Sequence, residues 1–474
     1  MNELLYKSVE NDTPSTTLPV KGSIPSWLKG DFFRNGPAKF ELGKYQLNHW
    51  FDGFSVLHKF ELEEGTVKYK SKFLQSEDYI TNLKEGKIKS RHYGTVPDPC
   101  GSLFQKFFSA FKIPNPDNAN VSVVKVGNSI AAVSDFSTMV EFDYNTLETK
   151  GRVKHRDVLG NKYMFSASHP SFDPTTGEFY NCAGMPGPKG KIHVFKMKEE
   201  PFKREMVGLL KLPRHTYYHS FAITKKYFIF IEQPLELNIW KLMFGRVLNT
   251  PYEGSYNWRP ENGMKFHLLD RKTGAWKVFK TDSFFFFHSV NAFDQEESVI
   301  VDLCLYPNPR IIDLLYIKQL KENGLAVEDM AQLNRISINL ETGKVDIESL
   351  SRERFDLPTF NFDKGCQRYQ YVYGLGFRDG ISNDVNNQLI KIDISGKTTL
   401  KWYEHGKYPS EPIFVQAPDA AIEDEGVILS VVLDTEKQSS FLLVLNAVNF
   451  QELARADAPV HLPIGLHGMF YSKK

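Results

Sequence analysis

Short apolar stretches followed by polar turns recur along almost the whole chain, and this pattern restricts the possible folds more than any other feature. The clearest turns are Asp-Arg-Lys-Thr-Gly at 270–274, Asn-Leu-Glu-Thr-Gly at 339–343 and Asp-Ile-Ser-Gly at 393–396. Each follows a run rich in β-branched or large apolar residues, which is typical of strands joined by tight turns. The pattern predicts an all-β sandwich, barrel or propeller.

The predicted strands extend from the first third of the chain to its end. They lie at 121–133 (divided by a turn at 127–128), 140–142, 227–231, 265–269, 298–305, 335–338, 389–392, 427–432 and 441–445. The segment 309–322 has apolar residues near helical spacing and is predicted as a helical insertion. Because no polar linker divides the sequence, we expect a single domain over residues 1–474. The lack of a fixed-period repeat disfavours a WD40 or kelch propeller and leaves a degenerate propeller open.

The composition agrees with a globular protein and gives no sign of a nucleic-acid partner. The 474 residues are 41% apolar and 24% charged, with a formal net charge of +1. Nucleic-acid binding requires a clustered basic surface, which this balance does not indicate. Aromatic residues make up 14% of the chain, and this content suits either a β-rich core or a large apolar ligand.

The cysteines and the apolar segments indicate in which cellular compartment the protein is expected. The first 22 residues are polar and mixed in charge, unlike a signal peptide. The densest apolar cluster, 284–287, is far shorter than the roughly 20 residues of a membrane span. Cysteines without C-x-x-C spacing predict no disulfide framework or zinc-thiolate site and favour a reducing compartment; they are Cys100, Cys182, Cys304 and Cys366. We expect a cytoplasmic protein, soluble or held on one membrane face.

Four of the thirteen histidines stand among apolar or small residues at predicted strand ends; they are His169, His219, His288 and His467. Their wide separation is compatible with different propeller blades converging on one axis. A divalent metal would then be a natural occupant, because neutral imidazole binds zinc, copper, iron and nickel. The alternative is that each is a structural histidine with ordinary hydrogen-bond partners. Spacing alone leaves both interpretations open.

An ordered set of short motifs carries a family resemblance. The set comprises Phe33-Arg-Asn-Gly-Pro37, His49-Trp-Phe-Asp-Gly-Phe54, Tyr217-Tyr-His-Ser-Phe221, Phe228-Ile-Phe-Ile-Glu-Gln-Pro234, Phe287-His-Ser-Val-Asn291, Tyr373-Gly-Leu-Gly376, Pro409-Ser-Glu-Pro-Ile-Phe-Val415 and Leu462-Pro-Ile-Gly-Leu-His-Gly-Met-Phe470. Together these motifs resemble the carotenoid cleavage oxygenases, a family that includes the β-carotene oxygenases and the retinoid isomerohydrolase. The resemblance covers nearly the whole chain, from about residue 20 to the C-terminus.

The resemblance implies a seven-bladed β-propeller with a helical and loop cap over its metal-bearing face. It also implies iron(II) on the propeller axis, held by four histidines that match His169, His219, His288 and His467. Such ligand histidines usually donate their other ring N–H to an outer acceptor. In the family three glutamates accept these hydrogen bonds.

This sequence departs from the family at two of those three acceptors. Glu411 matches the third glutamate, whereas Asp135 and Asp356 stand where the other two are expected. Aspartate is one methylene shorter, so the backbone must approach, a water must bridge, or the correspondence is wrong. Glu141 and Glu353 are the alternative acceptors, and a turn or surface role is the alternative for the aspartates.

The segment 103–111 is predicted as an amphipathic helix. Its apolar residues share one helical face; they are Leu103, Phe104, Phe107, Phe108 and Phe111. This face predicts an interfacial membrane anchor, although packing into the core or an oligomer contact would also bury it. The family takes up water-insoluble substrates from membranes, which favours peripheral membrane contact. The stretch 235–248 is expected to extend the patch.

The resemblance therefore implies an iron(II)-dependent dioxygenase acting on a carotenoid or apocarotenoid and O₂. Dioxygen adds across one C=C bond and gives two aldehyde or ketone products, with central cleavage of β-carotene to retinal as the favoured case. A retinoid isomerohydrolase or a stilbene-cleaving oxygenase is the alternative within the family. A non-catalytic propeller that binds an apolar ligand is the alternative outside enzymes.

Overall fold

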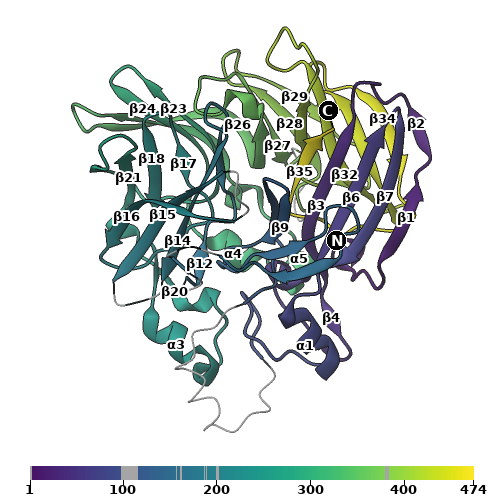
Figure 1. Ribbon diagram of the computed structural model, residues 1–474, viewed down its shortest axis with the longest axis horizontal. Helices are drawn as coiled ribbons and strands as arrows, with labels where there is room; N and C mark the ends of the chain where they lie inside the picture. Colours follow the sequence, from purple (N-terminus) through teal and green to yellow (C-terminus); the bar gives the residue numbers. More distant parts are fainter. Residues whose placement is uncertain are drawn as a thin grey trace.

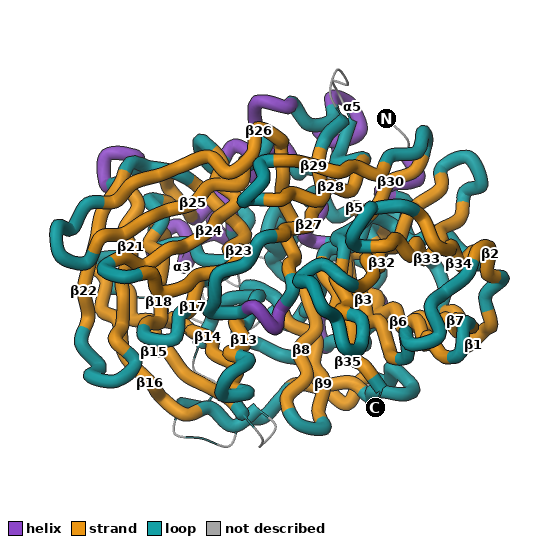
Figure 2. Tube along the Cα trace, turned by 90° about the horizontal axis from the view of Figure 1, so that it is seen from above, coloured by secondary structure: helices purple, strands orange, loops and turns teal. Residues whose placement is uncertain are grey.

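Antiparallel sheets make up most of the computed structural model. It describes residues 3–97, 116–155, 157, 159–160, 163–185, 187, 189–198, 202–378 and 384–473. Figure 1 shows strands from both ends of the chain together on one side and the teal sheets of the middle of the chain on the other. Figure 2, seen from above, shows how few of the described segments are helical. The all-β prediction is confirmed.

The first sheet joins the two ends of the chain. Its order is β1 (Thr13–Thr17), β7 (Thr66–Phe73), β6 (Phe54–Glu63), β3 (Gly30–Lys39) and β35 (His467–Ser472). In the antiparallel β3–β35 pair, Asn35 lies opposite His467. The last strand of the chain is therefore held by one of the first.

Three antiparallel sheets follow in chain order. One contains β8 (Ser122–Val126), β9 (Ser129–Val133), β10 (Val140–Phe142) and β11 (Thr149–Arg152). The next contains β12 (Phe165–Ser166), β13 (Ser171–Asp173), β14 (Glu178–Met185), β15 (Gly190–Met197) and β16 (Glu205–Leu212). The third contains β17 (Ala222–Ile223), β18 (Tyr227–Glu232), β21 (Met264–Asp270) and β22 (Trp276–Thr281).

A seven-stranded sheet covers the next part of the chain. Its strands are β23 (Phe285–Gln295), β24 (Ser298–Tyr306), β25 (Gln332–Asn339), β26 (Val345–Phe360), β27 (Tyr371–Gly376), β28 (Gln388–Asp393) and β29 (Thr398–Trp402). The 16-residue strand β26 pairs with β25 mainly through its first part and with β27 through its last part. One long strand thus connects two four-stranded halves.

The last large sheet again combines both ends of the chain. It contains β2 (Val20–Gly22), β34 (Glu452–Asp457), β33 (Ser439–Asn446), β32 (Gly426–Asp434), β30 (Lys407–Pro409) and β31 (Ile413–Gln416). Pairing of β2 with β34 ties the N-terminal region to this sheet. Two small hairpins are β4 (Glu41–Leu42) with β5 (Tyr45–Gln46), and β19 (Leu235–Leu237) with β20 (Tyr256–Trp258).

The helices within the described residues are short. They are α1 (Glu77–Glu85), α3 (Ile239–Leu248), α4 (Arg310–Leu314) and α5 (Ile317–Asn323), with 3-10 turns at Glu3–Tyr6, Trp50–Asp52, Glu253–Ser255, Pro260–Asn262, Val327–Asp329 and Phe362–Lys364. The predicted helical insertion at 309–322 is confirmed, but it is two helices, because Tyr316 is extended. Both pack into one apolar cluster with the strand residues Phe285 and Phe287.

Two expectations from the sequence concern a membrane-spanning helix and a membrane anchor. Within the described ranges, no helix is long and apolar enough to cross a membrane. The predicted anchor at 103–111 lies outside the described residues. The stretch 235–248 is described, and it forms β19 and the helix α3.

Candidate metal centre

Four histidines from distant parts of the chain come together at one point. One nitrogen from each of His169, His219, His288 and His467 lies within 4.8 Å of the other three. The Nε2 atoms of His169 and His219 are 3.1 Å apart, and those of His288 and His467 are 3.3 Å apart. All four predicted ligand positions are therefore in one cluster.

The sheet architecture explains this convergence. His467 begins β35 and His288 lies in β23, while His169 lies between β12 and β13 and His219 precedes β17. The strands β35, β23, β12 and β17 each stand at one end of their sheet. Figure 2 shows β8 beside β35, and the His467 N–H donates to the Val121 carbonyl over 3.2 Å. The histidines thus project from adjacent sheet edges into the middle of the molecule.

Burial keeps two of these rings, His169 and His467, in the neutral state that binds metals. Burial lowers the pKa of His169 and of His467 well below the ordinary imidazole value, and the neighbouring histidines add to the effect. A neutral imidazole has one N–H and one free lone pair. At neutral pH the His169 and His467 rings are therefore available as ligands.

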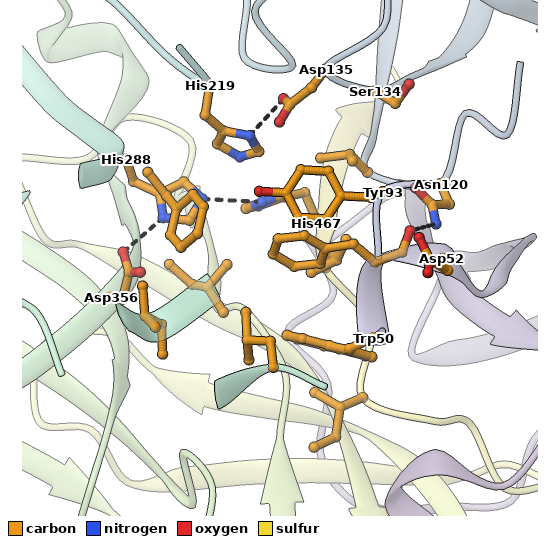
Figure 3. Close-up of a pocket in the computed structure, with 18 of the residues that line it drawn as sticks. Trp50, Asp52, Tyr93, Asn120, Ser134, Asp135, His219, His288, Asp356 and His467 are labelled. Atoms are coloured by element: carbon orange, nitrogen blue, oxygen red, sulfur yellow. Dashed lines mark hydrogen bonds and ion pairs between the residues drawn. The ribbon is translucent and has the colours of Figure 1, made fainter. Parts of the chain in front are cut away.

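A carboxylate orients each of three imidazoles, as Figure 3 shows for two of them. The His219 Nδ1 lies 2.7 Å from Asp135 Oδ1, and the His288 Nδ1 lies 2.7 Å from Asp356 Oδ1. His467 Nδ1 lies 2.7 Å from Glu411 Oε1. An Nδ1–H donated to a carboxylate leaves the Nε2 lone pair free to face the cluster. Among the described residues, no carboxylate is hydrogen-bonded to His169.

The two alternative acceptors, Glu141 and Glu353, form ion pairs with lysines and not hydrogen bonds with the clustered histidines. Glu141 lies 3.5 Å from Lys150 Nζ, and Glu353 lies 2.8 Å from Lys401 Nζ. The shorter aspartates reach the imidazoles directly, so neither a bridging water nor a shifted correspondence is needed. The geometry favours Asp135 and Asp356 over the two glutamates.

Residues that the sequence analysis did not single out hold the carboxylates. Arg34 Nη1 lies 3.3 Å from Glu411 Oε2, and the Gly468 N–H donates to the same oxygen over 2.9 Å. Burial still raises the pKa of Glu411 to about 7. The hydroxyl of Tyr217 donates to Asp135, and that of Tyr306 donates to Asp356. Arg34 and Tyr217 lie inside the quoted motifs, which was the only signal for them.

Two cavities reach the cluster from different sides. One is bordered by His219, His288 and His467 and by apolar side chains that include Trp50, Phe51, Tyr93, Phe287, Ile311 and Leu315. Figure 3 shows Tyr93 and Trp50 beside the histidines and their aspartates. The other cavity is bordered by His169, His288, His467 and Glu411. The first cavity has the apolar lining that a large apolar molecule needs, and such a molecule would lie directly against the histidines.

The donor set fits a divalent transition metal. Four imidazoles with no carboxylate among the converging atoms suit iron, zinc, copper or nickel. Three of the other described histidines have structural hydrogen-bond partners instead. His49 Nε2 lies 2.9 Å from the Ile312 carbonyl, His58 Nδ1 lies 2.9 Å from the Tyr69 hydroxyl, and His267 Nε2 lies 2.6 Å from Glu232. The structural interpretation therefore holds for these three.

Known proteins resemble this chain over its whole length. The family model described as retinal pigment epithelial membrane protein matches residues 6–472. A mitochondrial carotenoid-cleaving dioxygenase from Mustela putorius furo is 33% identical, over 98% of this chain and 95% of the relative. The Homo sapiens β,β-carotene 15,15'-dioxygenase is 32% identical, over 95% and 91%. A variant of the Synechocystis apocarotenoid oxygenase has the same fold, with a TM-score of 0.90 at 23% identity, covering 100% of this chain and 98% of that one.

Proposed function

This chain belongs to the retinal pigment epithelial membrane protein family, and from that membership we propose that it is an iron(II)-dependent carotenoid cleavage dioxygenase. It cleaves one C=C bond of a carotenoid or apocarotenoid and gives two aldehyde or ketone products. The observation that carries the proposal is the convergence of four histidines beside an aromatic cavity. The named activities of the aligned relatives support the same reaction class.

The fold in this proposal is a seven-bladed propeller formed by one domain over residues 1–474. Dividing the seven-stranded sheet at β26 gives two four-stranded units, which join the five other large sheets. Pairing of β35 with β3 and of β2 with β34 supports a ring closed by the two chain ends. The helices α4 and α5 supply Ile311 and Leu320 to the cavity border, Leu315 follows α4, and the two helices form part of the cap.

His169, His219, His288 and His467 hold the iron, and Asp135, Asp356 and Glu411 orient three of the rings. Bound iron(II) supplies the centre at which dioxygen is activated for addition to the double bond. The chain itself binds and orients the polyene. Aromatic side chains such as Phe51, Tyr93 and Phe287 exclude water and determine which double bond lies at the histidines.

Peripheral membrane contact, from the cytoplasmic side, is the second part of the proposal. Exposed apolar side chains lie on α1 and α3, which project on the same side of the molecule in Figure 1; they are Ile80 (47% exposed), Leu83 (50%), Trp240 (66%), Val247 (36%) and Leu248 (56%). Trp at an apolar surface favours the interface between lipid and water. The predicted Phe face at 103–111 belongs to the same proposal but lies outside the described residues.

The membrane contact is tested by liposome co-sedimentation of a Trp240→Ser, Leu248→Ser variant. We expect weaker binding, because each exposed apolar side chain contributes roughly 1.5–3 kcal/mol when buried. Val278→Ser is the control, since Val278 is also exposed (54%) but lies on β22. If both variants bind liposomes as strongly as the wild type does, α3 is not part of the membrane-binding surface.

The catalytic proposal is tested by incubating iron-loaded protein with β-carotene in micelles. Cleavage shortens the conjugated chain, so the visible absorbance falls and chromatography shows shorter carbonyl products. A product that keeps the intact chromophore would contradict cleavage. Binding without any product would identify a non-catalytic carotenoid-binding protein.

A further inference from the structure

We propose that Tyr217 and Tyr306 are positioning residues that adapt the metal centre to its two shortened carboxylates. The inference rests on the metal centre of the proposed function. Asp135 and Asp356 each accept a hydrogen bond from a tyrosine hydroxyl, whereas Glu411 interacts with Arg34 and the Gly468 N–H. The tyrosines therefore accompany the two aspartates and not the full-length glutamate.

Both aspartates have the same arrangement, with an imidazole on Oδ1 and a tyrosine hydroxyl on Oδ2. Asp135 Oδ1 lies 2.7 Å from His219 Nδ1, and its Oδ2 accepts from the Tyr217 hydroxyl over 2.8 Å. A carboxylate held at one oxygen can rotate about its last side-chain torsion, which is a soft coordinate. A second hydrogen bond from a buried donor opposes that rotation and keeps Oδ1 on the imidazole.

At the other aspartate, Asp356 Oδ1 lies 2.7 Å from His288 Nδ1, and its Oδ2 accepts from Tyr306 over 2.5 Å. Tyr306 ends β24, the neighbour of the strand β23 that carries His288. The phenol and the imidazole thus come from paired strands and approach the same carboxylate. Each strand fixes its own side chain, so the aspartate is held from two directions.

The tyrosines themselves are rigidly placed. Tyr217 and Tyr306 are buried, with 3% and 2% of their surface exposed. The Tyr217 N–H donates to the Leu235 carbonyl over 2.9 Å, and its ring packs against Phe285 and Tyr256. A hydroxyl on such a ring is a fixed donor. Asp135 is also bound by the Ser168 hydroxyl, next to His169, so its orientation concerns two of the four histidines.

The test removes only the hydroxyl groups and measures metal binding without any carotenoid. Tyr217→Phe and Tyr306→Phe are loaded with cobalt(II), whose visible absorption reports the ligand field, and with iron(II). We expect both metals to bind with roughly 10–100-fold lower affinity than in the wild type, with an altered cobalt spectrum. Tyr218→Phe is the matched control, because Tyr218 is buried beside Tyr217 in the sequence but packs on Phe230 and His215.

A rescue experiment separates positioning from general packing. In Asp135→Glu combined with Tyr217→Phe, and in Asp356→Glu combined with Tyr306→Phe, the longer carboxylate no longer needs the phenol. We expect most of the lost affinity and the wild-type cobalt spectrum to return. This outcome would not follow if the hydroxyls only stabilised the fold.

Two results would overturn the inference. One is wild-type metal affinity and an unchanged cobalt spectrum in both Phe variants, whatever their melting temperatures. The other is loss of metal in the Phe variants that the glutamate replacements do not reverse. A wild-type protein that binds neither metal would remove the proposed metal centre itself, and the inference with it.

Discussion

At the scale of single residues, each of three clustered imidazoles uses one nitrogen for a carboxylate and leaves the other for the cluster. His288 shows this most simply, with Nδ1 on Asp356 and Nε2 3.3 Å from His467 Nε2. We therefore expect His288→Ala to lose bound iron and all cleavage activity, because one of four ligands is gone. Metal analysis of purified protein checks this, with the exposed His405→Ala as control. Full iron content in His288→Ala would contradict the ligand assignment.

The aspartates give a second prediction at this scale. Asp135→Asn and Asp356→Asn keep the side-chain volume but weaken acceptance from the imidazole N–H. We expect roughly 10–100-fold lower metal affinity or activity with the fold retained, as for other outer-shell partners. Glu141→Gln and Glu353→Gln are the matched controls, because their carboxylates pair with lysines away from the cluster. If Asp135→Asn and Asp356→Asn bind iron as well as the two controls and the wild type do, the two aspartates do not orient the imidazoles.

At the scale of elements, the pairing of β35 with β3 places His467. A Cβ added at Gly468 would lie 2.4 Å from the Phe33 carbonyl oxygen and 2.6 Å from Arg34 Cδ. We expect Gly468→Ala to push β35 away from β3, with a loss of about 1–3 kcal/mol of stability and a lower iron content. Gly254→Ala is the control, since the atoms nearest to its added Cβ are 3.7 and 3.8 Å away. Thermal unfolding and metal analysis measure both effects, and equal behaviour of the two variants would show that the contact is not critical.

Local patterns predicted the elements well because their causes are local. The turns at 270–274 and 339–343 have glycine at φ +73° and +74°, and Asp270 and Asn339 accept backbone N–H bonds inside the turns. In the turn after Ile392, the positive φ belongs to Lys397, so Gly396 was not the residue that required it. The length of β26 was not predictable, because its two parts pair with different neighbours. Long-range pairing also decided that Asp135 and Asp356 lie on the histidines.

At the scale of the whole molecule, the two chain ends help to bring the four-histidine cluster together. Arg34 in β3 contacts Glu411 and donates to the Leu466 carbonyl over 3.0 Å, so an N-terminal strand supports two C-terminal segments. The histidine motifs predicted which residues converge, but not Arg34, Tyr217 or Tyr306 as supports. These contacts join residues far apart in sequence, and a single sequence contains no measure of such distances.

Cleavage of a carotenoid by dioxygen at the four-histidine centre has a specific isotopic signature. The most direct measurement is mass spectrometry of the products formed from β-carotene under isotopically heavy dioxygen, with reduction at the quench to stop exchange with water. We expect iron-loaded wild type to give two cleavage products, each with one heavy oxygen atom, and His288→Ala to give none. A product that keeps the intact polyene, or cleavage products whose oxygen comes only from water, would contradict this reaction.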